Sequence, residues 1–539
     1  MAIGQAARQG RLDDAALVLG DRLAAGSLYR LLADEGDRLF GDDYFADLFK
    51  ASRLGRPTVP ARVVATVMLL QAYEGLSDGE AVDRLAYDLR WQAAAGVSVA
   101  AGSFHPTVLV GMRNRLRASD RARRLFEDVN AVARSAGLLR GRRRVLDSTP
   151  LHDAVATQDT VTQLRAAIRK LLMVADKHAT AVAAVVRAGL SRDDDYAAPG
   201  KPPCDWDDPA AREALIDALV RDCHAALAVL HDRHLPAPVA EAAALLALVA
   251  GQDVEHGDDE IFRIARKVAR DRTISTVDTQ ARHGHKSRRR TFDGYKTHLA
   301  VDPDDEMITE VALTPANTPD RDAVDDLLAA DTTPGSGDHD NEPDPSSLPG
   351  ALEIFGDSAY ADGATLDRLA EAGHTVVAKV PPVRNRGGLF TKDQFSVDLP
   401  NSSVTCPAGN TVAITAARRG GGKASFAPHC GQCPLRRQCT TSKAGRGVAI
   451  HPHEARLQTA RAAQQDPAWQ QAYRSTRPTV ERKIAHFVRR AWGGRQARCR
   501  GTRRILTDVL TRAAVLNLAR LAVKGLHHQP RGWAIPTTG

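Results

Sequence analysis

The chain has 539 residues, of which 43% are hydrophobic and 26% charged, a composition typical of soluble globular proteins. This length exceeds what one hydrophobic core supports, so we expect two to four folding units. No run approaches the ~20 apolar residues of a membrane span, no signal-peptide pattern follows Met1, and seven unevenly spaced cysteines do not form a secreted disulfide framework. These features argue against membrane and secreted classes and favour a cytoplasmic protein.

The first half of the chain is predicted to be mainly helical. Residues up to about 140 carry the 3.6-residue periodicity of amphipathic helices, with Gly55-Arg56-Pro57 as a breaker. A first strand is expected at about 143–148. Residues 158–270 then predict a long helical stretch, interrupted by a loop at 191–209.

The second half alternates short strands and helices. Two strands at 292–302 and 307–315, joined by the turn-forming Pro303-Asp304-Asp305, predict a hairpin. An acidic linker rich in Pro, Gly and Ser at 331–350 is expected to be disordered. The other elements expected here are a helix near 320–330, a strand ending at Asp357, a helix at 362–372 and a strand at 374–381.

Three carboxylates stand out from this pattern. Asp147 and Asp357 each close a short apolar run and are followed by a small polar residue, which predicts two carboxylates at a sheet's carboxyl edge. Glu481 opens a helical pattern and shares a face with the apolar positions three, four and seven residues later. An unpaired carboxylate on an inward face is costly, and two Mg²⁺ ions would supply the partner that two-metal phosphoryl transfer uses. The alternative is that these are ordinary strand ends meeting solvent.

Positive charge is concentrated near the candidate carboxylates. Residues 471–531 hold fifteen Lys and Arg against two acids, a net charge of +13, so the other residues sum to about −5. A second basic cluster, Arg282 to Arg290, precedes the predicted hairpin in what we expect to be a loop. Within it, surface or phosphate contact is favoured over metal ligation for His283 and His285. Basic runs are often only solvated surface, but two of them flanking acidic strand ends favour nucleic acid as the ligand.

Four of the seven cysteines cluster. Cys406, Cys430, Cys433 and Cys439 include a C-x2-C pair and can close a tetrahedral Zn²⁺ site. The five residues between Cys433 and Cys439 are not a standard zinc-ribbon spacing, so an iron-sulfur cluster or plain thiols remain alternatives. The isolated cysteines are interpreted as structural; they are Cys204, Cys223 and Cys499.

The order of these elements is that of an RNase H-like nucleotidyltransferase core, and the chain resembles bacterial insertion-sequence transposases of the DDE type. It is similar to the branch with a helical N-terminal domain and a cysteine-bearing insertion before the final Glu. The resemblance covers nearly the whole chain and rests on specific blocks, among them GRPTVPARVVATVMLLQAYEGL, FHPTVLVGMRNRL, VLDSTPL, STVDTQARHGHKSRRRTFDGYKTHLAVD, TPANTPDRDAV and IFGDSAYAD.

The resemblance implies roles for individual residues. Asp147, Asp357 and Glu481 would bind the catalytic Mg²⁺ or Mn²⁺. Related transposases carry a Tyr, an Arg and a Lys around the Glu that contact DNA. Here Arg477 stands at the expected spacing, Tyr473 is one residue further away than usual, and the lysine position is a valine followed by two arginines. The residues expected to contact DNA are Tyr473, Arg477, Arg489, Arg490, Arg288, Arg289, Arg290 and Lys296.

The expected fold is therefore an α/β, RNase H-like mixed sheet with flanking helices, behind an all-α N-terminal domain and with two insertions. The expected units are a helical DNA-binding domain 1–140, core segments 141–157 and 271–380, a helical insertion 158–270, a cysteine-containing insertion 381–465, C-terminal core helices 466–531 and a tail 532–539.

The expected function is metal-dependent cleavage of double-stranded DNA at the element's terminal inverted repeats, followed by strand transfer into target DNA. The N-terminal domain would read the ends, the basic C-terminal stretch would hold phosphates, and a nucleoid-associated homodimer would be the active form. The alternatives are an RNase H-like nuclease and a catalytically inactive or domesticated DNA-binding protein.

Overall fold

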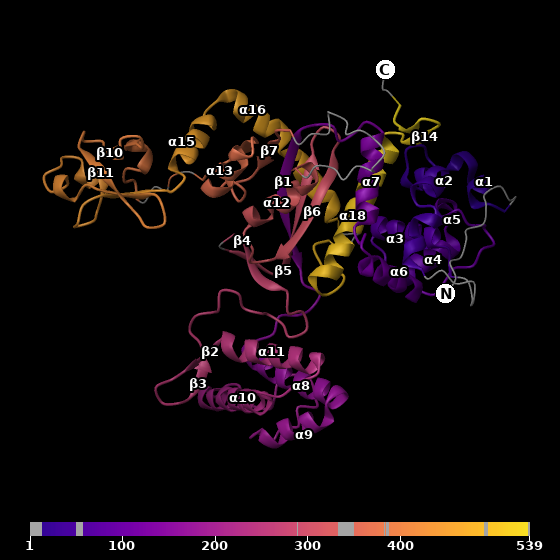
Figure 1. Ribbon diagram of the computed structural model, residues 1–539, viewed down its shortest axis with the longest axis horizontal. Helices are drawn as coiled ribbons and strands as arrows, with labels where there is room; N and C mark the ends of the chain where they lie inside the picture. The colour runs from indigo at the N-terminus through magenta and orange to yellow at the C-terminus, as the bar shows by residue number, and fades with distance from the viewer. Residues whose placement is uncertain are drawn as a thin grey trace.

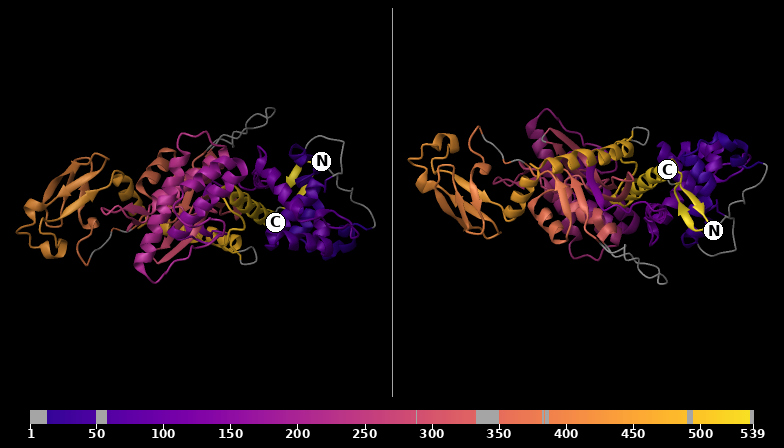
Figure 2. Two further views of the ribbon diagram at one scale, coloured as in Figure 1. Left: turned by 90° about the horizontal axis from the view of Figure 1, so that it is seen from below. Right: turned by 90° about the horizontal axis from the view of Figure 1, so that it is seen from above.

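The protein is a mixed α/β molecule in which a central sheet is surrounded by three further units (Figure 1). The computed structural model describes residues 13–49, 58–287, 289–332, 350–381, 383, 387–489 and 494–536. Seen from below and above, the molecule is elongated, with the N-terminal helices at one end and a small cysteine-bearing sheet at the other (Figure 2). None of the described helices is long and apolar enough to cross a membrane.

The N-terminal unit is helical, as predicted. Gly75, in a left-handed conformation with φ 71°, ends one helix, and the capping box of Ser77 and Glu80 starts the next. The predicted breaker at 55–57 lies outside the described residues. The helices are α1 (Ala15–Leu19), α2 (Leu28–Leu39), α3 (Ala61–Glu74), α4 (Asp78–Tyr87), α5 (Leu89–Ala95), α6 (Thr107–Ala118) and α7 (Arg124–Ser135).

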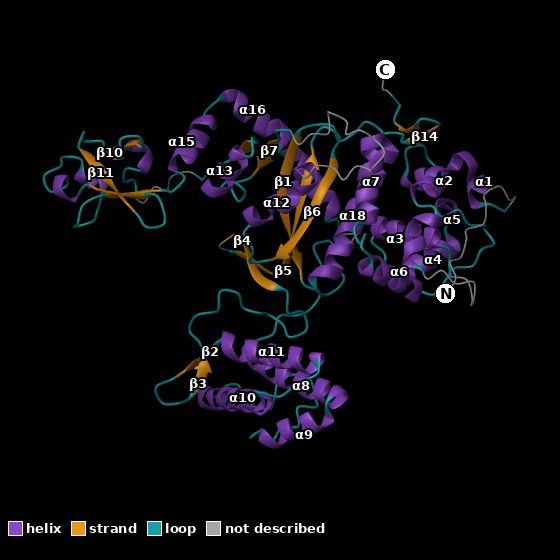
Figure 3. Ribbon diagram, in the orientation of Figure 1, coloured by secondary structure: helices purple, strands orange, loops and turns teal. Residues whose placement is uncertain are grey.

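The central sheet has six strands, and β5 is its hub. β5 runs antiparallel to β1, β4 and β6, whereas β7 and β8 run parallel to β1, so the order is β4/β6-β5-β1-β7-β8. Strands are concentrated here and in the cysteine-bearing unit (Figure 3). The six strands are β1 (Arg143–His152), β4 (Arg282–Ser287), β5 (Arg290–Asp302), β6 (Met307–Pro315), β7 (Glu353–Gly356) and β8 (Thr375–Ala378).

The predicted hairpin and the strand preceding Asp357 are confirmed. Two predictions about the strands of this sheet are wrong. The first strand does not end near 148 but continues to His152, because its antiparallel partner β5 pairs with it as far as Gly294. The basic cluster that begins at Arg282 is not a loop, because its backbone pairs with β5 as strand β4.

Helices cover both faces of the sheet. On one face α12 and α13 pack over an apolar cluster that contains Leu146, Ala300 and Leu327. The other face joins the core of the N-terminal helices through α17 and α18. The helices predicted near 320–330 and 362–372 are confirmed. Their bounds and those of the C-terminal helices are η3 (Asp320–Ala323), α12 (Val324–Thr332), α13 (Gly363–Glu371), α15 (Glu454–Ala463), α16 (Pro467–Thr476), α17 (Pro478–Phe487) and α18 (Thr502–Val523).

Helix α18 is enclosed between the sheet and the N-terminal helices, where it packs against β6, α7 and α3. Asn517 at its centre is fully buried; its side chain accepts from the backbone N–H of Ile308 at 2.9 Å and donates to the carbonyl of Ile308 at 2.7 Å. It also donates to Asn130 of α7 at 2.8 Å. These hydrogen bonds join α18 to both β6 and α7 through one side chain.

The insertion after β1 is a helical unit with its own hydrophobic core. Both of its ends meet beside the sheet, where the backbone N–H of Gln158 donates to the carbonyl of Ile274 at 2.9 Å. Residues 254–264 form a short hairpin around Gly257 and not the predicted helix, because α11 ends at Gln252, whose side chain bonds the backbone of Thr273. The elements are α8 (Thr160–His178), α9 (Thr180–Gly189), α10 (Pro209–Leu230), α11 (Ala237–Gln252), β2 (Val254–His256) and β3 (Phe262–Ile264).

The cysteine-bearing insertion is a five-stranded antiparallel sheet with a small core. A two-stranded hairpin follows α18 and occupies part of the expected tail. The acidic linker predicted at 331–350 falls almost wholly outside the described residues. The remaining elements are β9 (Ser396–Asp398), β10 (Ser403–Thr405), β11 (Thr411–Ala416), β12 (Gly422–Ser425), α14 (Arg436–Cys439), β13 (Gly447–Ile450), β14 (His527–Gln529) and β15 (Gly532–Ala534).

A buried carboxylate beside β1 makes stability depend on pH. Asp153 is 7% exposed, and burial, with the carboxylate of Asp278 adding to it, raises its pKa to about 6. Because the raised pKa favours the protonated form in the folded state, this contribution to stability is full below the unfolded pKa and is lost as pH rises through about 6. We therefore predict that Asp153→Asn stabilises the protein by about 1–3 kcal/mol at pH 8, and that this gain shrinks steadily as the pH is lowered towards about 4, the usual pKa of an aspartate in an unfolded chain.

The measurement is thermal unfolding of both proteins across this pH range. Asp258→Asn, which changes an exposed carboxylate in the β2–β3 turn, is the matched control. A variant that remains equally or less stable than the parent at pH 8 would contradict the prediction.

Candidate functional site

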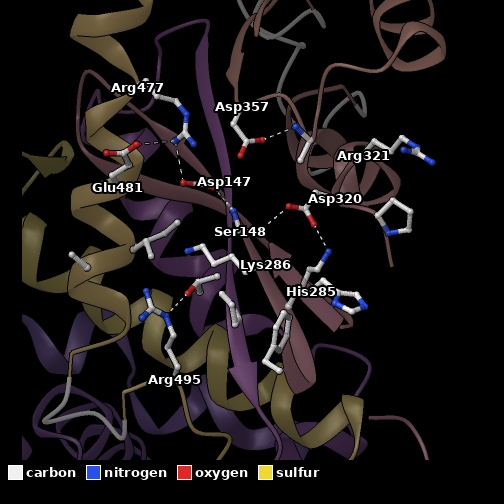
Figure 4. Close-up of a pocket in the computed structure, with 18 residues that line it drawn as sticks. Asp147, Ser148, His285, Lys286, Asp320, Arg321, Asp357, Arg477, Glu481 and Arg495 are labelled. Atoms are coloured by element: carbon white, nitrogen blue, oxygen red, sulfur yellow. Dashed lines mark hydrogen bonds and ion pairs between the residues drawn. The ribbon is translucent and has the colours of Figure 1, made fainter. Parts of the chain in front are cut away.

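A cavity of about 660 Å³ opens at the edge of the central sheet and receives all three predicted carboxylates. Asp147 enters it from β1, Asp357 from the end of β7 and Glu481 from α17 (Figure 4). These residues are far apart in the sequence and are brought together only by the sheet and the packing of α17 against β1 and β5. Basic side chains line the same cavity; they are His285, Lys286, Lys296, Arg321, Arg477 and Arg495.

Asp147 lies within a strand and not at its end, which corrects the sequence-based prediction. The parallel pairing of β1 with β7 stops at Val145, whereas the antiparallel pairing with β5 continues past Asp147, opposite Leu299. The carboxylate therefore stands just beyond the end of β7. Its Oδ1 accepts the backbone N–H of Ser148 at 2.8 Å.

Asp357 directly follows β7, as predicted. Burial raises the pKa of this carboxyl, and the negative charges of Asp147 and Asp320 act in the same direction. A hydrogen bond from the backbone N–H of Ala359, at 2.9 Å, opposes the increase in pKa, as does the charge of Arg477. The raised pKa means that like charges are held close together in a partly desolvated place.

Glu481 stands at the rim of the cavity. Its side chain is 62% exposed, so the prediction of an inward-facing, buried carboxylate is wrong. The reason is that α17 buries a neighbouring stripe, which includes Val480, Ile484 and Phe487. Pro478 occupies the first turn of α17, where its missing N–H costs nothing.

Arg477 bridges two of the three carboxylates. It lies between α16 and α17, and its Nη1 is 3.0 Å from Asp147 Oδ2 and 3.9 Å from Glu481 Oε1. Burial works against its charged form, but the surrounding negative groups, Asp147 foremost, outweigh burial and raise the pKa of Arg477. The cavity thus holds a positive charge at the point where its carboxylates converge.

Two protein-family models match the chain. The Transposase domain (DUF772) model matches residues 17–115, which span α1 to α6. The Transposase DDE domain model matches residues 405–522, which include Arg477, Glu481 and nearly all of α18. Together the two matches support an insertion-sequence transposase of the DDE type. No curated protein and no solved structure matches this transposase significantly.

The carboxylates of this transposase fit a divalent metal by their chemistry. Carboxylate oxygens are the ligands that Mg²⁺ and Mn²⁺ prefer. Burial, with the negative charges of Asp147 and Asp320 adding to it, raises the pKa of Asp357, and a bound cation would favour its charged form. Within the described residues, no group of three or more His, Cys, Asp or Glu side chains is gathered closely enough to hold a metal ion. Metal binding therefore requires these side chains to close together.

The residues predicted to contact DNA are only partly brought together. Arg477 and Lys296 line the cavity. Tyr473 does not; it is stacked on Trp469 with ring centroids 5.3 Å apart. Three exposed arginines are also absent from its lining: Arg289 in the β4–β5 turn, Arg290 at the start of β5 and Arg489 after α17. Arg288 and Arg490 lie outside the described residues.

A fourth carboxylate in the cavity was missed by the sequence analysis. Asp320, at the start of η3, accepts from Lys296 Nζ at 2.6 Å and from Ser148 Oγ at 2.6 Å. It follows Pro319 as the first residue of a short 3-10 helix, and no apolar run leads directly up to it. The only available signal was its position inside the TPANTPDRDAV block.

The four clustered cysteines line one cavity, but they too are not gathered closely enough in the described structure to hold a metal ion. Cys406, Cys430, Cys433 and Cys439 line one small cavity of about 20 Å³ within the five-stranded sheet unit, and all four are free thiols. The backbone N–H of Arg446 donates to Cys430 Sγ at 3.4 Å. Cys204, Cys223 and Cys499 lie elsewhere.

The Lys296–Asp320 pair is nearly buried, with side chains 15% and 12% exposed. Removing one charge leaves the other without its partner in a poorly solvated place, so Lys296→Met should lower the free energy of unfolding by about 2–4 kcal/mol. Adding Asp320→Asn should recover part of that loss. The check is urea denaturation, with Lys286→Met, an exposed lysine of the same cavity, as the control. A loss no larger than that of the control would show that the pair contributes little.

Proposed function

We propose that this transposase cleaves DNA at the ends of its insertion sequence and joins those ends to target DNA by metal-dependent phosphoryl transfer. The observation that carries the proposal is the convergence of Asp147, Asp357 and Glu481 on one cavity lined by basic side chains. The family supports a DNA substrate. The element's terminal repeats, the target DNA and a homodimeric active complex are further parts of this proposal.

An RNase H-like core is part of the same proposal. Its support is the sheet order, in which a hairpin of antiparallel strands, β5 and β6, flanks β1 on one side and two parallel strands, β7 and β8, flank it on the other. The two aspartates come from adjacent strands β1 and β7, and the glutamate comes from a helix packed on β1. On this basis the domain division expected from sequence is retained as a proposal.

The carboxylates Asp147, Asp357 and Glu481 would hold Mg²⁺ or Mn²⁺. When bound, such ions lower the pKa of water and stabilise the leaving oxygen of the phosphodiester. The protein's own cations would position DNA phosphates around the carboxylates. Arg495, whose Nε donates to Thr149 Oγ1 at 3.0 Å, is held at the cavity in an orientation that suits this role.

Replacing a carboxylate should separate cleavage from binding. Asp147→Asn, Asp357→Asn or Glu481→Gln should each lower the rate of end cleavage at least ~100-fold, and the losses should not add in double variants, because the three residues serve one metal site. Affinity for DNA ends should change little. The measurements are cleavage of flanked-end DNA with Mg²⁺ or Mn²⁺ and, separately, DNA binding without metal.

Asp326→Asn, an exposed carboxylate on α12, serves as the control for charge loss. If a folded variant of one of the three carboxylates cleaves as the parent does, that residue has no place in the catalytic set. If the parent binds ends but never cleaves them under any divalent metal, the chain is a DNA-binding protein without this activity.

The four clustered cysteines are proposed to bind one structural Zn²⁺. Support comes from four thiols around one small cavity and from donors aimed at sulfur, the N–H of Arg446 and the amide of Asn410, which is 3.8 Å from Cys406 Sγ. The sheet that carries them has only a small apolar core. Units of this kind gain folding free energy from a metal, because the ligands are gathered only in the folded state.

We expect elemental analysis of the purified protein to give one zinc per chain. The double variant Cys430→Ser with Cys433→Ser should lose the metal and become sensitive to proteolysis within residues 390–450. The matched control is Cys204→Ser with Cys499→Ser, which removes two thiols outside the cluster. Iron in place of zinc would indicate an iron-sulfur cluster, and protein that is folded without either metal would identify ordinary thiols.

A further inference from the structure

A second basic surface lies between the N-terminal helices and the start of α18. Two adjoining cavities, of about 340 and 570 Å³, share the side chains of Asn114, Arg117 and Arg504. We call this surface the arginine groove. Its arginines come from α6, from the segment before α18 and from the first turn of α18; they are Arg113, Arg117, Arg498, Arg500, Arg503 and Arg504.

Most of the positive charge in the arginine groove is uncompensated. Arg113 pairs with Asp78, with Nη2 and Oδ2 2.5 Å apart. Among the described residues, the other five arginines form no ion pair with a carboxylate. Asp508 also lines the groove, but its carboxylate is 2.8 Å from Arg512 Nη2 and is neutralised there. The groove therefore carries a clear excess of positive charge.

The arginines are close enough to repel one another. The pKa of Arg117 is lowered, first by burial and next by the charge of Arg504, with smaller contributions from Arg113 and Arg503. The guanidinium of Arg503 donates to the backbone carbonyl of Arg117, so charges from α6 and α18 are held together by the fold. Holding like charges together costs free energy, and a ligand of opposite charge removes that cost.

The neutral side chains of the groove suit the same kind of ligand. Asn114, Gln280, Thr507 and Thr511 contribute amides and hydroxyls to its lining. Arginines combined with amide and hydroxyl groups are how proteins hold the phosphate and sugar oxygens of nucleic acids. The first turn of α18 has no acidic residue, so its dipole adds to the positive potential.

The arginine groove is joined to the carboxylate cavity by one short segment of chain. Arg495 lines that cavity, while Arg498 and Arg500, three and five residues later, belong to the groove or its wall. A chain advances at most ~3.5 Å per residue, so the Cα atoms of Arg498 and Arg500 lie no more than roughly 10 and 18 Å from that of Arg495. This proximity supports one nucleic acid ligand for both sites.

We propose that the arginine groove binds the phosphodiester backbone of the DNA whose end is engaged in the carboxylate cavity, without reading its sequence. This inference rests on the proposed function. Because the groove is built from α6 and α18 together, a bound duplex contacts the N-terminal helices and the C-terminal part at once. Recognition of the end's sequence then belongs to other surfaces.

The test is the salt dependence of DNA binding by the full chain carrying Arg117→Gln and Arg504→Gln. The probe is a short fluorescent duplex of random sequence, followed by anisotropy over a range of NaCl concentrations. Each phosphate contact contributes about 0.9 to the slope of log K against log salt, so the slope should fall by about 2. Affinity at low salt should fall about tenfold, equally for random DNA and for the element's ends.

The control pair is Arg418→Gln with Arg419→Gln, two exposed arginines in the β11–β12 turn, which should leave the slope unchanged. Arg117→Lys with Arg504→Lys should keep the parent's salt slope, because the proposal requires the charge and not the shape of the side chain. If the glutamine pair unfolds, the exposed pair Arg498→Gln and Arg500→Gln replaces it.

The proposal would be overturned if the folded glutamine variant kept the parent's slope of log K against log salt. It would also be overturned if the variant lost affinity only for the element's ends and not for random DNA. These outcomes are separable from failure of the proposed function. If the carboxylates do not catalyse cleavage, the salt dependence of DNA binding stays as proposed. If the arginine groove does not bind DNA, metal-dependent cleavage at high protein concentration stays as proposed.

Discussion

The architecture depends on one buried amide. The β5–β6 pairing has a register shift between Ala300 and Val301, which leaves irregular backbone groups around Ile308. Asn517 of α18 satisfies both the N–H and the carbonyl of Ile308, and Asn130 of α7 donates to the same carbonyl at 3.2 Å. A buried backbone group without a partner is costly, so α7, β6 and α18 can be assembled in only one register. The helix that carries Glu481, α17, packs in turn on β1, β5 and α18.

Two carboxylates of the cavity are each paired with a basic side chain. Arg477 holds Asp147 and Lys296 holds Asp320, so two of the cavity's cations are already committed to carboxylates of the protein. Asp357 has no such ion pair among the described residues, and burial, followed by the negative charges of Asp147 and Asp320, raises its pKa. Glu481 is the most exposed of the group and lies 3.9 Å from Arg477 at the rim of the cavity. The paired charges therefore lie on the strand side of the site, and the most solvated carboxylate lies on the helix side.

Sequence reasoning succeeded where a residue's place in the fold depends on its local pattern. Asp357 could be placed because an apolar run ends immediately before it, and Glu481 because proline and helical periodicity mark its helix. The extent of β1 could not be predicted, because residues beyond Asp147 are ordered by pairing with a strand more than 140 residues later. Asp320 follows no periodic segment, and the approach of Arg117 to Arg503 joins residues 386 apart, which no local pattern reports.

The helical unit after β1 has a consequence for how this protein could change over generations. Its chain enters and leaves at one place, where Gln158 is hydrogen-bonded to Ile274, and the side chain of Gln163 bonds the carbonyl of Thr273 at 2.9 Å. The unit is connected to the sheet through these two hydrogen-bonded ends. The free energy of closing a loop changes slowly with the loop's length. The unit can therefore be enlarged, trimmed or exchanged by mutation without shifting a strand, which makes it the part of the molecule best suited to diverge while the rest is inherited intact.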